Sequence, residues 1–194
     1  MTRIVAGAAG GRRLAVPVGS GTRPTSDRAR EGLFSTLQAL LGSLAGARFL
    51  DLYAGSGAVG LEALSRGAAH VLLVESQGAA ARTVRANVAA VGLPGAEVRT
   101  APVERTVARA PGTPSYGVVF LDPPFDLPDD DLRRVLVALH GNGWLTVDAL
   151  AVVERSVRGD GWSWPDGFTA ERSRRYGEAG LWYGRAAGQP PAGR

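Results

Sequence analysis

The sequence predicts an α/β fold with a mostly parallel sheet of about seven strands, and three observations point to it. From Arg48 onward, continuous apolar runs alternate with amphipathic helical segments, which is the pattern of parallel strands covered on both faces by helices. The later segment ERSRRYGEAGLWYGR reads as two strands around a glycine-containing turn, which predicts a C-terminal antiparallel hairpin. The first 22 residues hold the short apolar pieces RIVAG and RRLAVPV, which predict a small N-terminal β-hairpin or arm.

The individual elements follow from local signals. Ser26 or Asp27 can cap a helix, because either side chain can accept a hydrogen bond from the first free backbone amides. Leucines at helical spacing after this cap predict one apolar face, made of Leu33, Leu37, Leu40, Leu41 and Leu44. The predicted strands cover residues 48–53, 70–75, 96–101, 116–122 and 149–154. The predicted helices between them lie near residues 57–66, 78–91, 103–110 and 129–140.

The composition limits the classes of function. Of the 194 residues, 45% are hydrophobic and 21% are charged, which suits one globular domain with a sizeable core. The absence of cysteine excludes disulfides, cysteine-zinc sites and thiol nucleophiles, and no close cluster of histidines and acids suggests a metal site. The start MTRIVAGAAGGRR has no sustained apolar stretch, so we expect no signal peptide, no membrane span and a cytoplasmic protein.

Positive charge gathers toward the two ends of the chain. All 22 basic residues are arginine, a bias that a GC-rich genome explains, so the distribution is more informative than the count. The first thirty residues carry six arginines against a single acid, and residues 171–194 carry five against two. A basic patch of this kind suits a polyanionic partner, whereas a solvated terminus without function is the competing interpretation. The predicted RNA-facing set is Arg3, Arg12, Arg13, Arg23, Arg28 and Arg30.

A glycine-rich loop follows the first central strand. The segment LDLYAGSGAVG (50–60) stands between a strand and a helix, where glycines let a ligand approach and the helix start offers free amide donors. Glu75 ends the next strand, 20 residues after Gly55, the spacing expected of a carboxylate that grips ribose hydroxyls. A nicotinamide or flavin dinucleotide therefore fits the motif. Asp51, inside the strand, would repel a pyrophosphate and attract an ammonium group, which favours S-adenosylmethionine.

A second motif, FLDPPF, ends the fourth central strand at Asp122. The prolines stop the strand and fix the turn, because proline cannot continue a central strand or a helix. An exocyclic amino group on a base is a poor nucleophile, and hydrogen bonds to the Asp122 carboxylate and the Pro123 carbonyl would turn its lone pair toward a methyl donor. Phe125 would offer a flat face on which an extruded base can stack. The predicted catalytic residues are Asp122, Pro123, Pro124 and Phe125.

Taken with these motifs, the stretch RPTSDRAREGLF (23–34) followed by FLDLYAGSGAVGLEALSRGA resembles the RsmD family. The resemblance runs from about Arg3 to Arg185 and implies a Rossmann-like methyltransferase that uses S-adenosylmethionine. It implies methylation of the exocyclic amino group of one guanine in 16S ribosomal RNA, within an assembled or partly assembled small subunit. It also implies that the basic N-terminal arm helps to engage RNA.

We expect three parts along the chain: a basic hairpin or arm (1–22), a methyltransferase domain (23–186), and a tail (187–194) whose Gly/Pro/Ala-rich composition predicts disorder. We also expect a monomer. Many methyltransferases place a polar residue against the adenine of the cofactor, directly after the third strand. This chain has Ala101-Pro102-Val103 at that place. We therefore expect the adenine to be bound by the Val103 amide or by its neighbour Glu104. The predicted cofactor-binding residues are Asp51, Ala54, Gly55, Ser56, Gly57, Glu75, Val103 and Asp122. Other functions remain open: methylation of adenine in DNA or of a protein glutamine, dinucleotide-dependent oxidoreduction, and RNA binding without catalysis.

Overall fold

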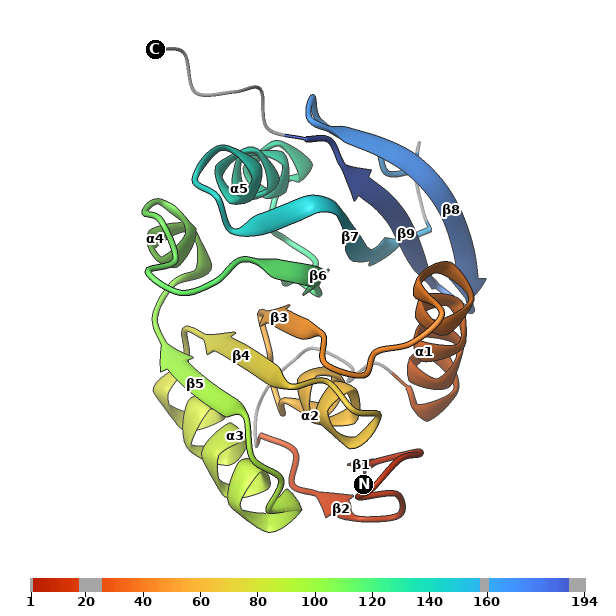
Figure 1. Cartoon of the computed structure of the whole chain (residues 1–194), viewed down its shortest axis with the longest axis vertical. Helices are drawn as coiled ribbons and strands as arrows, with labels where there is room; N and C mark the ends of the chain where they lie inside the picture. Colours follow the sequence, from red (N-terminus) through yellow and green to blue (C-terminus); the bar gives the residue numbers. More distant parts are fainter. Residues whose placement is uncertain (1, 18–25, 158–160, 189–194) are drawn as a thin grey trace. The chain divides into compact units, whose positions relative to one another are not determined.

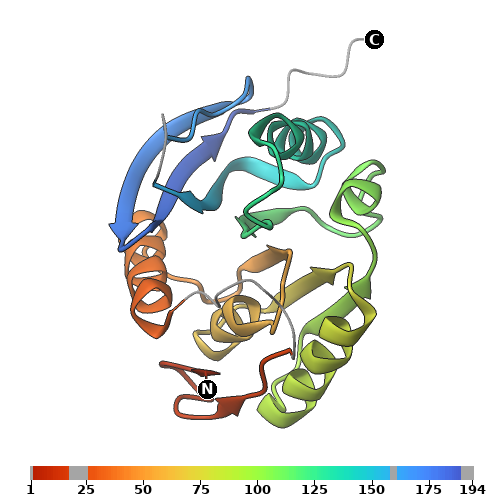
Figure 2. The ribbon, with the colours of Figure 1, turned by 180° about the vertical axis from the view of Figure 1, so that it is seen from behind.

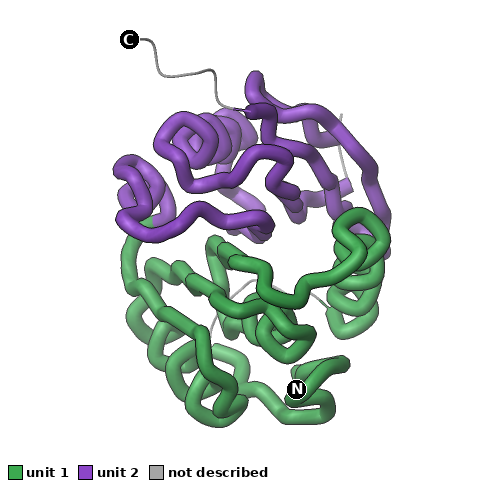
Figure 3. Tube along the Cα trace, in the orientation of Figure 1, with its two compact units in different colours: residues 1–102 green, residues 103–194 purple. Residues whose placement is uncertain are grey.

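The computed structural model describes residues 2–17, 26–157 and 161–188. The chain divides into two units, residues 1–102 and residues 103–194 (Figure 3). Residues 189–194, most of the predicted tail, lie outside the described residues, as does the RPT part of the RPTSDRAREGLF motif. Within the described residues, no helix is both long and apolar enough to span a bilayer.

The first unit contains a parallel sheet with the strand order β5-β4-β3 (Figure 1). The middle strand is buried at every position except its first residue, because it has a hydrogen-bonded neighbour on each side and apolar side chains on both faces. All eight residues of α2 are buried as well. The elements of this part are α1 (Asp27–Leu41), β3 (Arg48–Leu52), α2 (Ala58–Ser65), β4 (His70–Glu75), α3 (Gly78–Val91) and β5 (Ala96–Thr100).

Helix α1 begins as the sequence predicts. The hydroxyl of Ser26 accepts a hydrogen bond from the Ala29 amide at 3.1 Å, which makes Ser26 the capping residue. Leu33 and Leu37 of the predicted apolar face are completely buried. The last residues of that face within the helix are only half-buried, because the helix ends at Gly42, whose φ of 75° turns the chain away.

The predicted N-terminal hairpin is present, and it is fastened to the unit's helices. Strands β1 (Thr2–Arg3) and β2 (Arg13–Leu14) pair antiparallel, and Figure 2 shows them beside α2 and the end of α3. The Glu62 carboxylate of α2 accepts hydrogen bonds from the Val5 amide at 2.7 Å and the Ala6 amide at 3.0 Å. Since Glu62 is completely buried, these bonds replace the water that its carboxylate has lost.

The second unit contributes four strands in the order β6-β7-β9-β8. The pair β6 and β7 is parallel, whereas β9 runs antiparallel to both β7 and β8. The strand β8 ends this order, and seven of its nine residues are exposed, as expected of an edge strand with one paired side. The elements are α4 (Val103–Val107), β6 (Tyr116–Leu121), α5 (Asp129–Gly141), β7 (Leu145–Ser156), β8 (Phe168–Tyr176) and β9 (Ala179–Ala186).

The strand β7 starts at Leu145, four residues earlier than predicted. Its register with β6 shifts between Tyr116 and Val118, and Asp148 has a φ of 58°, so the exposed residues 146–148 bulge out of the early part of the strand. Because these three residues interrupt the apolar run, the hydrophobic pattern detects the strand only from Ala149 onward. Besides the two hairpin strands, the first unit contributes three strands and the second unit four, so the protein has the predicted α/β fold with a seven-stranded, mostly parallel sheet and a C-terminal antiparallel hairpin.

Candidate functional site

The glycine loop connects β3 to α2 in the first unit. Some of its glycines permit close packing of α2, and another leaves the backbone open to a ligand. Gly57 and Gly60 allow α2 to lie close to β4: a methyl group added to Gly60 would stand 2.8 Å from the Val71 side chain. Gly55 faces open space, with a φ of 57° that favours glycine. Tyr53 adopts a positive φ of 61°, which is uncommon for an aromatic residue and indicates backbone strain in this loop. Gly55 is thus the position where a ligand can approach the backbone.

The structure brings Glu75 to this loop, as its spacing in the sequence suggests. Its Oε2 accepts a hydrogen bond from the Gly55 amide at 2.9 Å, and its Oε1 accepts one from the Gln77 amide at 2.8 Å. The side chain is buried, with 8% of the residue exposed. Because each carboxylate oxygen has two lone pairs, both oxygens can accept a further hydrogen bond from a ligand hydroxyl.

Asp51 lies deeper, with 2% of the residue exposed. Its Oδ2 accepts a hydrogen bond from the Gly60 amide at 2.8 Å, so the carboxyl group holds the first turn of α2. The pKa of Asp51 is raised to about 8: burial is the main cause, the Gly60 hydrogen bond opposes the rise, and the negative charge of Glu75 adds to it. A buried acid with such a pKa beside a glycine loop is typical of a functional site.

Asn87 of α3 also holds the loop, although the sequence analysis missed it. Its Nδ2 donates to the Ser56 carbonyl at 2.8 Å and to the Ala15 carbonyl at 2.9 Å, and its Oδ1 accepts from the Ala15 amide at 2.8 Å. Asn87 is 2% exposed and belongs to the buried side of α3 with Val84 and Val91. A polar residue in an apolar helical stripe was the available signal, because a buried carboxamide needs partners.

The Asp-Pro-Pro-Phe motif lies in the second unit, directly after β6. Asp122 is half-buried, Pro123 is buried and Pro124 is exposed. The Leu127 amide donates to the Pro124 carbonyl at 3.0 Å, which closes a β-turn over residues 124–127. Phe125 occupies this turn with 63% of its surface exposed, and it is the one aromatic residue of the described chain that is so exposed.

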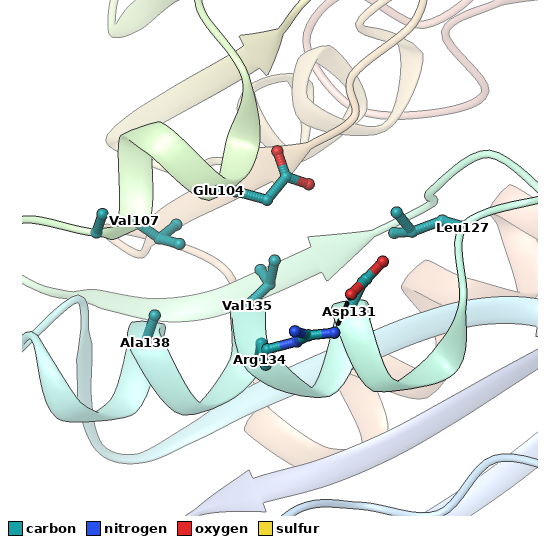
Figure 4. Close-up of a pocket in the computed structure, with 8 residues that line it drawn as sticks. Glu104, Val107, Leu127, Asp131, Arg134, Val135 and Ala138 are labelled. Atoms are coloured by element: carbon teal, nitrogen blue, oxygen red, sulfur yellow. Dashed lines mark hydrogen bonds and ion pairs between the residues drawn. The ribbon is translucent and has the colours of Figure 1, made fainter.

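A hollow of about 460 Å³ lies between α4 and α5 of the second unit (Figure 4). Its walls are largely apolar, with Glu104 on α4 and an ion pair between Asp131 and Arg134 on α5. Val103 at the start of α4 has a side chain that is almost completely buried, so an adenine contact at this residue would have to come from its backbone. Within the described residues, no group of three or more histidines and acids has a metal-binding arrangement.

The structure separates the predicted RNA-facing arginines into several groups. Arg3, Arg13 and Arg28 are exposed. Arg12 is exposed too, but its guanidinium donates to the Ala90 carbonyl at 2.8 Å and to the Val91 carbonyl at 2.6 Å at the end of α3. There it binds carbonyls that have no partner within the helix. Arg23 lies outside the described residues.

For Arg30, the prediction of direct RNA contact is wrong. This residue is completely buried. Its guanidinium donates to the Thr2 hydroxyl at 3.0 Å and to Asp27 at 2.8 Å, and it also binds the Arg3 carbonyl. It therefore fastens β1 to α1 and has no surface to offer to RNA.

Comparison with known proteins identifies relatives along most of the chain. The family model described as Conserved hypothetical protein 95 matches residues 2–185. The ribosomal RNA small subunit methyltransferase D of Escherichia coli K12 is 41% identical over 155 residues, which are 80% of this chain and 75% of that protein. The corresponding protein of Haemophilus influenzae is 36% identical over 154 residues, 78% of this chain and 77% of its own length.

Solved structures give the same picture. The structure titled "Putative methyltransferase yhhF from Escherichia coli" superposes with a TM-score of 0.82 at 34% identity, covering 97% of this chain and 99% of that one. Magnesium protoporphyrin IX methyltransferase from Synechocystis, solved with bound S-adenosylmethionine, has a TM-score of 0.64 at 14% identity over 82% of this chain and 79% of that one. The second likeness shows the fold alone.

Proposed function

Because the chain belongs to the RsmD family, the ribosomal RNA small subunit methyltransferase D proteins, we propose that it methylates the exocyclic amino group of a guanine in 16S ribosomal RNA. We propose S-adenosylmethionine as the methyl donor and the small ribosomal subunit, or an intermediate in its assembly, as the substrate. A ribosomal substrate places the enzyme in the cytoplasm, and we expect it to act as a monomer.

The observation that carries the choice of cofactor is the pair of carboxylates at the glycine loop. Glu75 binds the Gly55 amide, and Asp51 lies buried beneath the start of α2. The Glu75 carboxylate opposes a pyrophosphate, because like charges repel. Asp51 keeps its proton in the free protein at neutral pH, and a ligand ammonium group beside it would favour its ionised form, so the two acids suit a ligand that carries a ribose diol and an ammonium group. S-adenosylmethionine has both of these groups and contains no phosphate.

We assign the cofactor contacts accordingly. Glu75 would accept hydrogen bonds from the ribose hydroxyls, and Asp51 would lose its proton and pair with the ammonium end when the cofactor binds. The open backbone at Gly55 lets the ligand approach, and Ala54, Ser56 and Gly57 shape the rest of the loop. Val103 would meet the adenine through its backbone amide. When bound, the cofactor supplies a methyl group on a sulfonium, which is an electrophilic carbon with a good leaving group.

The Asp-Pro-Pro-Phe turn would hold the base. Two hydrogen bonds from the guanine amino group, one to the Asp122 carboxylate and one to the Pro123 carbonyl, would point the nitrogen lone pair at the methyl carbon. The cofactor would give up its methyl carbon to the nitrogen and keep the electron pair of the carbon–sulfur bond on sulfur. The methylated nitrogen would then be acidic and would give one proton to Asp122 or to water. Phe125 would stack on the extruded base, Pro124 would fix the turn, and Asp122 would also lie at the cofactor's methyl group.

RNA would be engaged by the exposed basic residues around the N-terminal hairpin. Arg3, Arg13 and Arg28 are exposed. Arg12, which directly precedes β2, is exposed as well. Arginine suits this task because its planar guanidinium pairs with phosphate through two parallel hydrogen bonds. We include Arg23 on the basis of the sequence alone.

The test supplies methyl-labelled S-adenosylmethionine to the purified protein. The acceptors are small subunits that lack the modification, naked 16S RNA, DNA and a protein extract. Label in the small subunit or its RNA, mapped to a guanine amino group and lost with Asp122→Ala, is the expected result. Label in DNA or in a protein glutamine would show that methyl transfer is correct but that the proposed substrate is wrong. Thermal stabilisation by NAD, and none by S-adenosylmethionine, would indicate an oxidoreductase in place of a methyltransferase. RNA binding without any methyl transfer would indicate an assembly factor.

A further inference from the structure

Arg155, near the end of β7, binds the loop that follows the Asp-Pro-Pro-Phe motif. Its Nη2 donates to the Leu127 carbonyl at 2.7 Å and to the Asp129 carboxylate at 2.5 Å. Its Nη1 points to the Pro124 carbonyl at 3.4 Å, a longer and weaker contact. The Arg155 side chain is only 14% exposed, so these bonds are shielded from water on most sides. All of these residues belong to the second unit.

The acceptors of Arg155 mark both ends of one turn. Pro124 and Leu127 are the first and last residues of the β-turn closed by the Leu127 amide. Asp129 begins α5, where a carboxylate is favoured by the helix dipole. One guanidinium thus connects the start of the turn, its end and the helix behind it. A lysine could not do this equally well, because its single ammonium lacks the planar, forked donors of arginine.

The turn held in this way carries Phe125 at its second position. A phenylalanine with 63% of its surface exposed gains nothing from burial in the folded chain, so its packing does not fix its position. The turn backbone must do so, and Arg155 supplies the side-chain contacts to that backbone. An ordinary surface ion pair contributes little to stability, but here two backbone carbonyls are bound as well, that of Leu127 in a part-buried hydrogen bond and that of Pro124 in a longer, exposed one.

We propose that Arg155 is a positioning residue for methyl transfer: it holds the 124–127 turn so that Phe125 and the Asp122 carboxylate meet the target base in the productive orientation. This inference rests on the proposed function. A misplacement of about 1 Å in a reacting geometry typically costs on the order of 100-fold in rate. Removal of Arg155 should therefore lower turnover while the cofactor loop, in the other unit, is unaffected.

The experiment compares Arg155→Met and Arg155→Lys with Arg185→Met as a matched control. Arg185 is also a strand arginine that binds one carboxylate, Glu171 at 2.8 Å, and one backbone carbonyl, Asp148 at 3.1 Å, but it does not touch the turn. The first measurement is amide hydrogen exchange at Leu127, followed by the affinity for S-adenosylmethionine and by single-turnover methylation of small subunits. Arg155→Met should speed exchange at Leu127 by about tenfold or more and slow methylation by roughly 10- to 100-fold, with cofactor affinity within about twofold of the natural protein.

Arg155→Lys should restore part of the rate, and the control should leave both exchange at Leu127 and turnover unchanged. A double variant separates positioning from a general loss of stability. In the Phe125→Ala background, Arg155→Met should slow methylation much less than it does alone, because residues that act through one another are not additive.

Unchanged exchange at Leu127 in Arg155→Met would show that Arg155 does not hold the turn. A loosened turn with an undiminished methylation rate, or fully additive effects in the double variant, would refute the positioning role. If the natural protein methylates no acceptor, the proposed function fails and the positioning role fails with it. In that case, hydrogen exchange at Leu127 would still show whether Arg155 holds the 124–127 turn, so the two failures are distinguishable.

Discussion

Replacing Asp51 by asparagine should stabilise the folded protein at neutral pH, and the gain should shrink as the pH is lowered. Asparagine keeps an oxygen that can accept the Gly60 hydrogen bond but carries no ionisable proton. In the natural chain, burial raises the pKa of Asp51 from 3.8 to about 8. Between these values the folded protein keeps the proton on Asp51 and the unfolded chain releases it. The free energy of unfolding therefore falls through this group as the pH rises toward 8.

The size of the effect follows from the same linkage. Each pH unit between the two pKa values costs about 1.4 kcal/mol of folding stability, so the interval from pH 5 to pH 7 corresponds to at most about 3 kcal/mol. Asp51 is 2% exposed, so screening by solvent reduces this value little, whereas local relaxation around the acid would reduce it more. The difference between variant and natural protein should grow by a value of this order over that interval.

Urea unfolding followed by tryptophan fluorescence and circular dichroism, at pH 5, 6 and 7, gives the required free energies. Asp166→Asn is the control, since it makes the same chemical change at an exposed aspartate in the other unit. A stability difference for Asp51→Asn that is constant with pH, or that is larger at pH 5 than at pH 7, would refute the reasoning. The asparagine variant should also bind S-adenosylmethionine more weakly, if the acid is retained for the cofactor's ammonium group.

Three further predictions concern the loop, the turn and the arm. Asp122→Ala should leave cofactor binding by calorimetry nearly intact and reduce methylation by roughly 10²–10³-fold, so near-normal turnover would remove its assigned role. Gly60→Ala should destabilise the fold by about 1–3 kcal/mol in urea, since the added methyl has no room. Gly55→Ala has room for the methyl, but a φ of 57° disfavours any side chain, so this variant should cost about 1–2 kcal/mol and also weaken cofactor binding. Arg12→Glu with Arg13→Glu should weaken RNA binding and flatten its salt dependence in filter-binding titrations. Arg13→Glu alone should reproduce part of this loss without touching the end of α3, and an unchanged salt slope would argue against the arm.

The alternation of apolar strands and amphipathic helices was sufficient to predict the fold, because burial on both faces leaves a continuous apolar run in the sequence. The contact between Glu75 and Gly55 was predictable as well, since parallel neighbouring strands end at the same edge. Arg30 was not, because a charge count cannot distinguish an exposed guanidinium from one whose partners come from Thr2, Asp27 and the Arg3 backbone.

Arg155 was missed for a related reason. Its acceptors lie 26 to 31 residues earlier in the chain, and two of them are backbone carbonyls that leave no mark in the sequence. Asn87 left a visible mark, a polar residue within an apolar stripe, but its partners at Ala15 and Ser56 could be assigned only from the fold.

The Asn87 carboxamide has a consequence for attempts to retarget the enzyme. An engineer who exchanged the N-terminal hairpin as a cassette, to redirect the protein to another RNA, would also exchange the backbone at Ala15 that satisfies Asn87. The same carboxamide binds the Ser56 carbonyl in the cofactor loop, so a graft that fits badly would disturb the loop from behind. With the roles proposed for the hairpin and the loop, target choice and cofactor affinity would not be separable design variables, and a successful graft would have to reproduce the two hydrogen bonds at position 15.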